Sequence, residues 1–167
     1  MVTTTTRQES AFYTHTLPNG LQMLGQKIPG VQSAAAVFYV NTGTRDENVK
    51  EMGVSHFLEH MAFRRSARMT GEEIDRVFEE LGAEHNAGTW KEMTFYWARV
   101  LGDNAGWAID VLSDLTRPAL DAADFDQERD VILEEIARYE DIPTHVLLDR
   151  FMHDYFGDHP LAWETLG

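Results

Sequence analysis

The stretch His56-Phe57-Leu58-Glu59-His60 constrains the fold of this chain more than any other. A helix advances about 100° per residue, so it would place His56 and His60 roughly 40° apart and Glu59 about 60° to the other side of His56. Two imidazoles at this spacing can bind one zinc ion, and a nearby carboxylate can deprotonate a water molecule on that ion. The order His-x-x-Glu-His reverses the commoner His-Glu-x-x-His zinc motif. The pattern therefore predicts a helix with a metal-dependent hydrolytic site on one face.

The pentapeptide alone is also compatible with two ordinary core or surface histidines, because short motifs match by chance. The residues around it favour the metal site. Val54, Met61 and Phe63 are apolar, so we expect a helix over residues 53–65 that is buried nearly all round. A buried carboxylate needs a partner, and a metal ion would supply one.

Composition restricts the alternatives. The 167 residues suit one domain with its own hydrophobic core. The formal net charge of −14 argues against nucleic acid as a partner, since phosphates would be repelled, and weakly favours basic or neutral substrates. Because the chain has no cysteine, any bound metal must use histidine and carboxylate ligands.

The beginning of the chain is polar and rich in threonine, and we expect residues 1–9 to be flexible. It contains no apolar segment of the kind found in secretory signals. The sequence has no apolar run of about 18 residues, so neither a membrane span nor a membrane partner is expected. These features make the cytoplasm the expected location.

Hydrophobic periodicity and turn residues predict an α+β fold, with a mostly antiparallel β-sheet packed against helices. Pro18-Asn19-Gly20 separates two strands and predicts a hairpin. The nearly unbroken apolar run over 32–42 is typical of a central strand. The other predicted strands cover 11–17, 21–28, 84–89 and 92–100, and the other predicted helices cover 72–81, 104–115, 121–139 and 144–155.

A catalytic zinc site usually has three protein ligands and one open position, so one more ligand is needed. Acidic residues cluster in the last long predicted helix, and helical periodicity separates them. Glu135 shares a largely apolar face with Val131 and Ile132, and should point inward. Glu134 lies on a solvated stripe instead. Glu128 precedes Glu135 by two turns, about 20° off the same line, and could reach the site or support it.

Three segments follow one another along the chain: HFLEHMAF, NAGTWKEMTFY and ERDVILEEI. In order and spacing they resemble the pitrilysin or insulinase-type zinc metallopeptidases, relatives of mitochondrial processing peptidase and insulin-degrading enzyme, and the resemblance covers residues 10–167. It implies that the zinc ligands are His56, His60 and Glu135. It also implies that Glu59 is the general base, and that the carboxylate of Glu128 supports the site without being a required ligand.

The function implied by the resemblance is a zinc metalloendopeptidase that hydrolyses peptide bonds by zinc-activated water. Asn86 and Ala87 match the segment that holds the substrate main chain beside the zinc, where the peptide binds as an added edge strand. Family members have longer chains built from two related halves. Residues 10–167 would then be an N-terminal catalytic domain, incomplete at its C-terminus and half of a duplicated metallopeptidase domain. The implied partners are a peptide substrate and the missing C-terminal half or a partner subunit, with a dimer left open.

The sequence can also be interpreted in two other ways. A non-catalytic structural or assembly subunit of the same fold would usually have lost motif residues, and every motif residue is present here. A purely structural zinc site usually has four protein ligands and favours cysteine, which this chain lacks. His85, next to Asn86, is expected to have a plain surface or packing role rather than to line the cleft.

Overall fold

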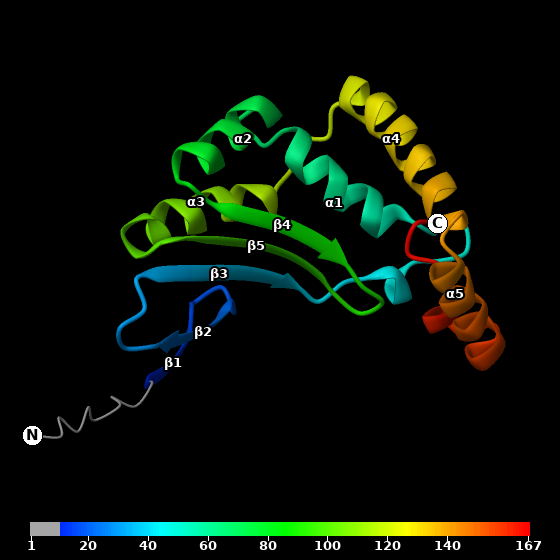
Figure 1. Cartoon of the computed structure of the whole chain (residues 1–167), viewed down its shortest axis with the longest axis horizontal. Helices are drawn as coiled ribbons and strands as arrows, with labels where there is room; N and C mark the ends of the chain where they lie inside the picture. The colour runs from blue at the N-terminus through cyan, green and yellow to red at the C-terminus, as the bar shows by residue number, and fades with distance from the viewer. Residues whose placement is uncertain (1–10) are drawn as a thin grey trace, which may run out of the picture. The chain divides into compact units, whose positions relative to one another are not determined.

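The computed structural model describes residues 11–167, so the predicted flexible segment 1–9 lies outside the described residues. The chain divides after Ser33 into two compact units. Helices and strands follow one another in the order β1-β2-β3-α1-α2-β4-β5-α3-α4-α5 (Figure 1). Two short 3-10 helices lie between these elements and a third follows α5. None of the described helices is both long enough and apolar enough to cross a membrane.

The first unit contains the predicted hairpin. β1 (Ala11–Thr16) and β2 (Gln22–Lys27) pair in antiparallel fashion. In the turn, Gly20 has a φ of +89°, a left-handed conformation that glycine adopts without steric penalty. Its amide donates a hydrogen bond to the carbonyl of Leu17 at 2.9 Å. The Pro-Asn-Gly sequence therefore reverses the chain as predicted.

The second unit contains a three-stranded sheet in the order β3-β5-β4. Its strands are β3 (Ser33–Val40), β4 (Glu84–Thr89) and β5 (Thr94–Leu101). β4 and β5 are antiparallel, and a short turn joins them, in which the Trp90 amide donates to the Met93 carbonyl at 2.8 Å. In Figure 1 the arrows of β3 and β4 point the same way on either side of β5.

The prediction that the apolar run over 32–42 forms a central strand is wrong, because β5 is the central strand of the described sheet. On β3, Ala36 and Phe38 pack against the core, but Val37 and Tyr39 on the opposite face are 42% and 65% exposed. An apolar run reports the chemistry of the two faces of a strand. It does not report how many of the two edges are hydrogen-bonded to neighbours.

Three helices cover one face of this sheet (Figure 1): α1 (Val54–Arg64), α2 (Gly71–Glu80) and α3 (Ala105–Leu115). Residues of β5 alternate between buried and more exposed, as expected for a strand with one face on the core. The buried apolar core is formed by Ala62, Ile74, Phe78, Tyr96, Ala98, Val100, Ala108, Val111, Leu112 and Leu115.

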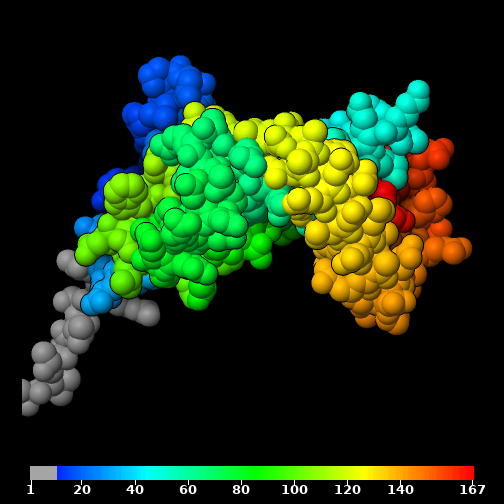
Figure 2. Space-filling model, turned by 90° about the horizontal axis from the view of Figure 1, so that it is seen from above, coloured from blue at the N-terminus to red at the C-terminus, as the bar shows by residue number. Residues whose placement is uncertain are grey.

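Two further helices follow α3 along the chain. α4 (Ala122–Glu140) begins where the Asp121 side chain accepts a hydrogen bond from the Ala123 amide at 2.8 Å, a typical N-cap. α5 (Pro143–Phe156) begins with proline, whose missing N–H is not needed at the first position of a helix. α4 packs beside α1, and their surfaces adjoin in the view from the helical side (Figure 2).

Candidate metal centre

The start of α1 is fixed by two contacts that set the positions of its histidines. The Glu47 carboxylate accepts hydrogen bonds from the amides of Gly53 at 2.8 Å and Ser55 at 2.7 Å. It thereby satisfies donors at the N-terminal end of the helix, where a negative charge is also favourable. Gly53 has a φ of +86°, and a Cβ added there would lie 2.6 Å from the carbonyl oxygen of Leu166. Glycine is therefore required at this position.

α1 and α4 bring three potential ligand atoms together. His56 and His60 lie one turn apart on α1, and their Nε2 atoms are 3.2 Å apart. From α4, Glu135 places Oε2 at 3.4 Å from the His60 Nε2 and at 3.7 Å from the His56 Nε2. Among residues 11–167, these three form the group of histidine and acidic side chains that could hold a metal ion.

The geometry of this triangle fits a zinc ion. Ligand atoms about 2.1 Å from a tetrahedral zinc lie roughly 3.4 Å from one another, and the three observed separations, 3.2, 3.4 and 3.7 Å, bracket that value. The His60 Nδ1 lies 2.8 Å from the Glu128 carboxylate, so in the neutral ring Nδ1 carries the hydrogen and Nε2 is an acceptor. The lone pair on the His60 Nε2 is therefore available at the point where the three ligand atoms meet, and a cation would be stabilised there.

Glu128 is placed to support His60 rather than to bind the metal. Its Oε1 is 2.8 Å from the His60 Nδ1, on the opposite side of the ring from Nε2, and its side chain is 9% exposed. Its other oxygen lies 3.6 Å from the Nε of Arg64. A carboxylate in this position fixes the ring orientation and makes the opposite nitrogen a better donor to a metal.

The surroundings of His56 favour the neutral form of its ring. Burial lowers the pKa of His56, and the neighbouring His60 lowers it further, while the charges of Glu135 and Glu47 act in the opposite direction. Its Nδ1 is buried and has no hydrogen-bond partner among the described residues. A neutral imidazole has a free lone pair, which is the form that binds metals.

Glu59 lies beside this group and is held from β4. The hydroxyl of Thr89 donates a hydrogen bond to Glu59 Oε2 at 2.6 Å. Burial raises the pKa of Glu59, while the Thr89 hydrogen bond and the charge of His60 lower it and the charge of Glu135 raises it. A carboxyl group with a raised pKa can both accept and return a proton. Tyr96 cannot take this role near neutral pH, because burial raises its pKa to about 12.

Asn86 and Ala87 lie on β4, at the sheet edge that no other described strand covers. α1 packs beside this strand. The Asn86 side-chain oxygen accepts a hydrogen bond from the Ala87 amide at 2.8 Å, so this edge donor is bonded within its own strand. His85 lies on the helix-covered face of β4 and stacks on Phe78, with ring centroids 3.9 Å apart, so it has a packing role.

Sequence reasoning did not identify two residues of this neighbourhood. Glu47 lies nine positions before His56, in a polar loop, and no local pattern marks it as the cap of α1. The sequence does contain a pattern that could have placed Thr89, because His85, Ala87 and Thr89 follow one another at a spacing of two. Alternate residues of a strand share a face, so Thr89 points toward α1 with the other two.

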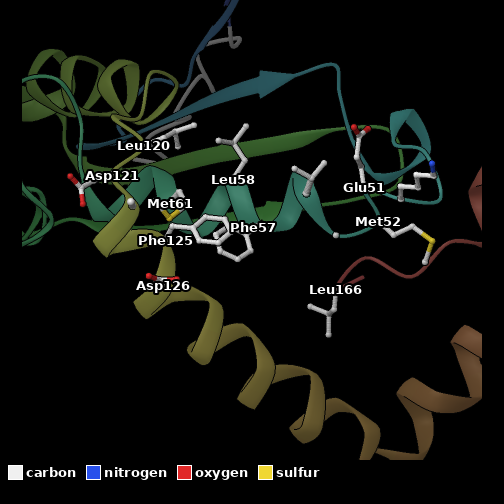
Figure 3. Close-up of a pocket in the computed structure, with 14 residues that line it drawn as sticks. Glu51, Met52, Phe57, Leu58, Met61, Leu120, Asp121, Phe125, Asp126 and Leu166 are labelled. Carbon is white, nitrogen blue, oxygen red and sulfur yellow. The ribbon is translucent and has the colours of Figure 1, made fainter.

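The expected burial of the motif helix on all sides is wrong, because Val54 and Leu58 are 52% and 44% exposed. They border a hollow of about 680 Å³ on the face of α1 turned away from the histidines (Figure 3). Phe57 and Phe125 also line it, and their rings stack with centroids 4.4 Å apart. The expected inward face of α4 is also only partly buried: Ile132 is 5% exposed, but Val131 is 50% exposed.

Comparison with known proteins gives a consistent result. The model of the family Insulinase (Peptidase family M16) matches residues 22–167. A protein of Mycobacterium tuberculosis described as an uncharacterized zinc protease is 40% identical over 153 residues, covering 91% of this chain and 35% of the relative. The beta subunit of the mitochondrial-processing peptidase of Saccharomyces cerevisiae is 36% identical over 168 residues, covering 100% of this chain and 36% of the relative.

A solved structure has the same fold. The crystal structure of a protease from Helicobacter pylori matches with a TM-score of 0.88 at 24% identity, over 94% of this chain and 38% of that one. The present chain spans about a third of the length of the two curated relatives. The fold class and the family predicted from the sequence are both confirmed. The chain belongs to the insulinase family of peptidases, family M16.

Proposed function

We propose that this chain carries the catalytic zinc site of a metalloendopeptidase. The observation that supports the proposal best is the convergence of His56 and His60 from α1 with Glu135 from α4. Glu59 lies beside the two histidines on α1. Three ligands with an open fourth position are typical of a catalytic zinc site, whereas structural sites are usually closed by four. The related protein of Mycobacterium tuberculosis is described as a zinc protease, which agrees with this assignment.

In the proposed reaction His56, His60 and Glu135 would hold a zinc ion, which would supply a Lewis acid to make a water molecule nucleophilic near neutral pH. Glu59 takes a proton from that water as it attacks the scissile carbonyl, and later gives it to the leaving amine. Glu128 holds the His60 ring in the tautomer that leaves Nε2 free. No covalent intermediate with the protein is formed.

We infer that the peptide substrate adds to the free edge of β4. A peptide bound in this way makes main-chain hydrogen bonds with the strand, as in other cases of β-augmentation. The main chain at Asn86 and Ala87 would then hold the substrate beside the ligands on α1, and the Ala87 amide would exchange its bond to the Asn86 side-chain oxygen for one to the peptide. The net charge of −14 gives a weak preference for basic peptides.

The remainder of a complete enzyme is also a matter of proposal, since the chain spans about a third of its curated relatives. A second half would come either from further chain or from a partner subunit. The yeast relative is itself one subunit of a processing peptidase. The alternative, a non-catalytic subunit of the same fold, predicts metal binding or partner binding without peptide cleavage.

The test compares zinc content and peptide cleavage in the full-length protein. Wild type is expected to bind about one zinc per site and to cleave members of a peptide library. Glu59→Gln should keep the zinc but lose about 10²–10⁴-fold in kcat, the usual contribution of a general base. Glu135→Gln should lose zinc and activity together, while Glu134→Gln, which removes an equal charge from an exposed neighbour, should change neither.

Three results would contradict the proposal. The first is full zinc occupancy in Glu135→Gln, which would exclude Glu135 as a ligand. The second is a zinc-loaded wild type that cleaves nothing, and the third is a Glu59→Gln variant that cleaves as wild type does. A zinc-loaded protein without peptidase activity would favour the non-catalytic subunit.

A further inference from the structure

The contact between β4 and Glu59 has a use beyond packing. Thr89 is the last residue of β4 and is 8% exposed. Its hydroxyl has a single hydrogen, which it donates to Glu59 Oε2 at 2.6 Å. No hydrogen bond from another described residue joins the second oxygen, Oε1. One oxygen of this carboxylate is therefore anchored and the other is available.

A glutamate needs such an anchor to act from a fixed position. Its side chain has several rotatable bonds and could otherwise sample several orientations in the space beside α1. An acceptor oxygen turned into a buried region without a donor is also unfavourable. The Thr89 hydroxyl removes both problems, because it comes from a different element that is itself fixed by pairing with β5.

Thr89 also links the carboxylate to the edge at which a peptide is proposed to bind. Ala87 and Thr89 are two positions apart on β4, so their side chains share a face and their Cα atoms lie about 6.7 Å apart along the strand. A shift of this strand would move the edge and the anchor of Glu59 together. The distance between the bound peptide and the base is then set within one short segment.

We propose that Thr89 is a positioning residue, which orients the Glu59 carboxylate relative to a peptide held on the edge of β4. The inference rests on the proposed function. It assigns no contact between Thr89 and the substrate or the metal. Its consequence is that removing the hydroxyl should impair the chemical step while leaving metal binding and peptide binding largely intact.

The chain offers a matched control. Thr94 lies directly opposite Thr89 in the β4–β5 register and is 7% exposed. Its hydroxyl donates to the main-chain carbonyl of Thr42 at 3.0 Å, away from Glu59. Replacing either threonine by valine removes one buried hydroxyl and one hydrogen bond at nearly constant volume. Only the substitution of Thr89 releases the carboxylate.

The first experiment measures kcat, KM and zinc content in the full-length protein. Thr89→Val should lower kcat by about 10–100-fold, as expected when a catalytic group is misplaced by a fraction of an ångström to one ångström. Its KM and zinc content should stay close to those of wild type. Thr89→Ser, which keeps the hydroxyl, should recover most of the activity. Thr94→Val should cleave as wild type does. If Thr89→Val fails to fold, Thr89→Ala serves in its place.

The second experiment tests the contact without relying on activity. A double-mutant cycle combines Thr89→Val with Glu59→Ala and follows thermal unfolding of the zinc-free protein. If the hydroxyl interacts with the carboxylate, the shift in Tm caused by Thr89→Val should be smaller by about 4 °C or more when Glu59 is absent. Additive shifts would overturn the inference.

The outcomes separate this inference from the proposed function. An active wild type, an inactive Glu59→Gln variant and a Thr89→Val variant with wild-type kcat would overturn the positioning role alone. An equal loss of kcat in Thr94→Val would also overturn it, since the effect would then be one of general destabilisation. A zinc-loaded wild type without peptidase activity would overturn the proposed function, and this inference with it.

Discussion

Glu128 should determine the zinc affinity of the site although its carboxylate faces away from the metal position. Its Oε1 lies 2.8 Å from the His60 Nδ1, and its side chain is only 9% exposed. Two substitutions separate its contributions. Glu128→Gln removes the charge but keeps an oxygen that can accept the hydrogen bond, whereas Glu128→Leu removes both.

The magnitude follows from the burial and the charge of this contact. A hydrogen bond to a charged group contributes about 1.5–3 kcal/mol net, and 9% exposure leaves little room for solvent to screen it. Loss of the carboxylate behind a metal-binding histidine typically weakens metal binding about 10–100-fold, which corresponds to about 1.4–2.7 kcal/mol. We expect about 10-fold for Glu128→Gln and about 100-fold for Glu128→Leu.

Arg64 must be separated from this effect. Its Nε lies 3.6 Å from the second oxygen of Glu128, so both substitutions also remove this ion pair. Arg64→Gln removes the ion pair and leaves the bond to His60 in place. The Arg64 side chain is 38% exposed, and pairs of this kind contribute about 0–1 kcal/mol, so zinc affinity should stay within about fivefold of wild type.

The assay is competition for zinc with a chromophoric chelator at constant pH, together with a check by circular dichroism that each variant is folded. Glu134→Gln is the matched control, since it removes the same charge from an exposed position of the same helix. Equal zinc affinities for Glu128→Leu and Glu134→Gln would refute the reasoning. A loss in Arg64→Gln as large as that in Glu128→Leu would refute it as well.

Two further predictions concern stability. Burial lowers the pKa of His85 below its ordinary value of 6.5, so its stabilising contribution is complete above that pH and is lost as the pH falls toward the folded-state pKa. His85→Phe keeps an aromatic ring stacked on Phe78 but removes the titrating group. The fall in Tm between neutral and acidic pH should therefore be smaller in this variant than in wild type. An identical fall in both proteins would contradict the prediction. Thr70 caps α2, accepting from the Glu73 amide while its own amide donates to the Glu73 carboxylate at 2.8 Å. Thr70→Ala should therefore lower the unfolding free energy by about 1 kcal/mol in urea titrations, and an unchanged midpoint would show that the cap is unimportant.

Periodicity was sufficient to predict most of the elements and one face of the site. The hairpin, the helix that carries the two histidines and the long helix that carries Glu135 are all present, since each has a strong local pattern. The placement of His56 and His60 on one face follows from helix geometry alone. Glu135 could be singled out from Glu134 because only one of the two lies on the side with buried neighbours.

The features that could not be predicted depend on contacts between distant segments. The order β3-β5-β4 is set by strand pairing, which an apolar run does not encode. The capping of α1 by Glu47 depends on how a polar loop folds back, and the exposure of Val54 and Leu58 depends on what covers that face of the helix. Thr89 could be placed on the correct face of its strand, but its partner on α1 could not be named.

The pairing of α1 with α4 explains why Glu135, and not Glu128, faces the metal position. On α1, a stripe is formed by His56, His60 and Arg64, which are spaced four residues apart. On α4, a second stripe is formed by Asp124, Glu128 and Glu135. The contacts run in opposite chain directions: Arg64 with Asp124 and Glu128, His60 with Glu128 and Glu135, and His56 with Glu135. At one end of this ladder a permanent cation, Arg64, balances the carboxylates. At the other end the Oε2 of Glu135 lies beside the Nε2 atoms of two imidazoles, while its Oε1 lies 3.4 Å from the guanidinium of Arg138, whose side chain is 68% exposed. No positively charged side chain of the described residues pairs with the oxygen that faces the two imidazoles, and a divalent cation bound there would provide that charge.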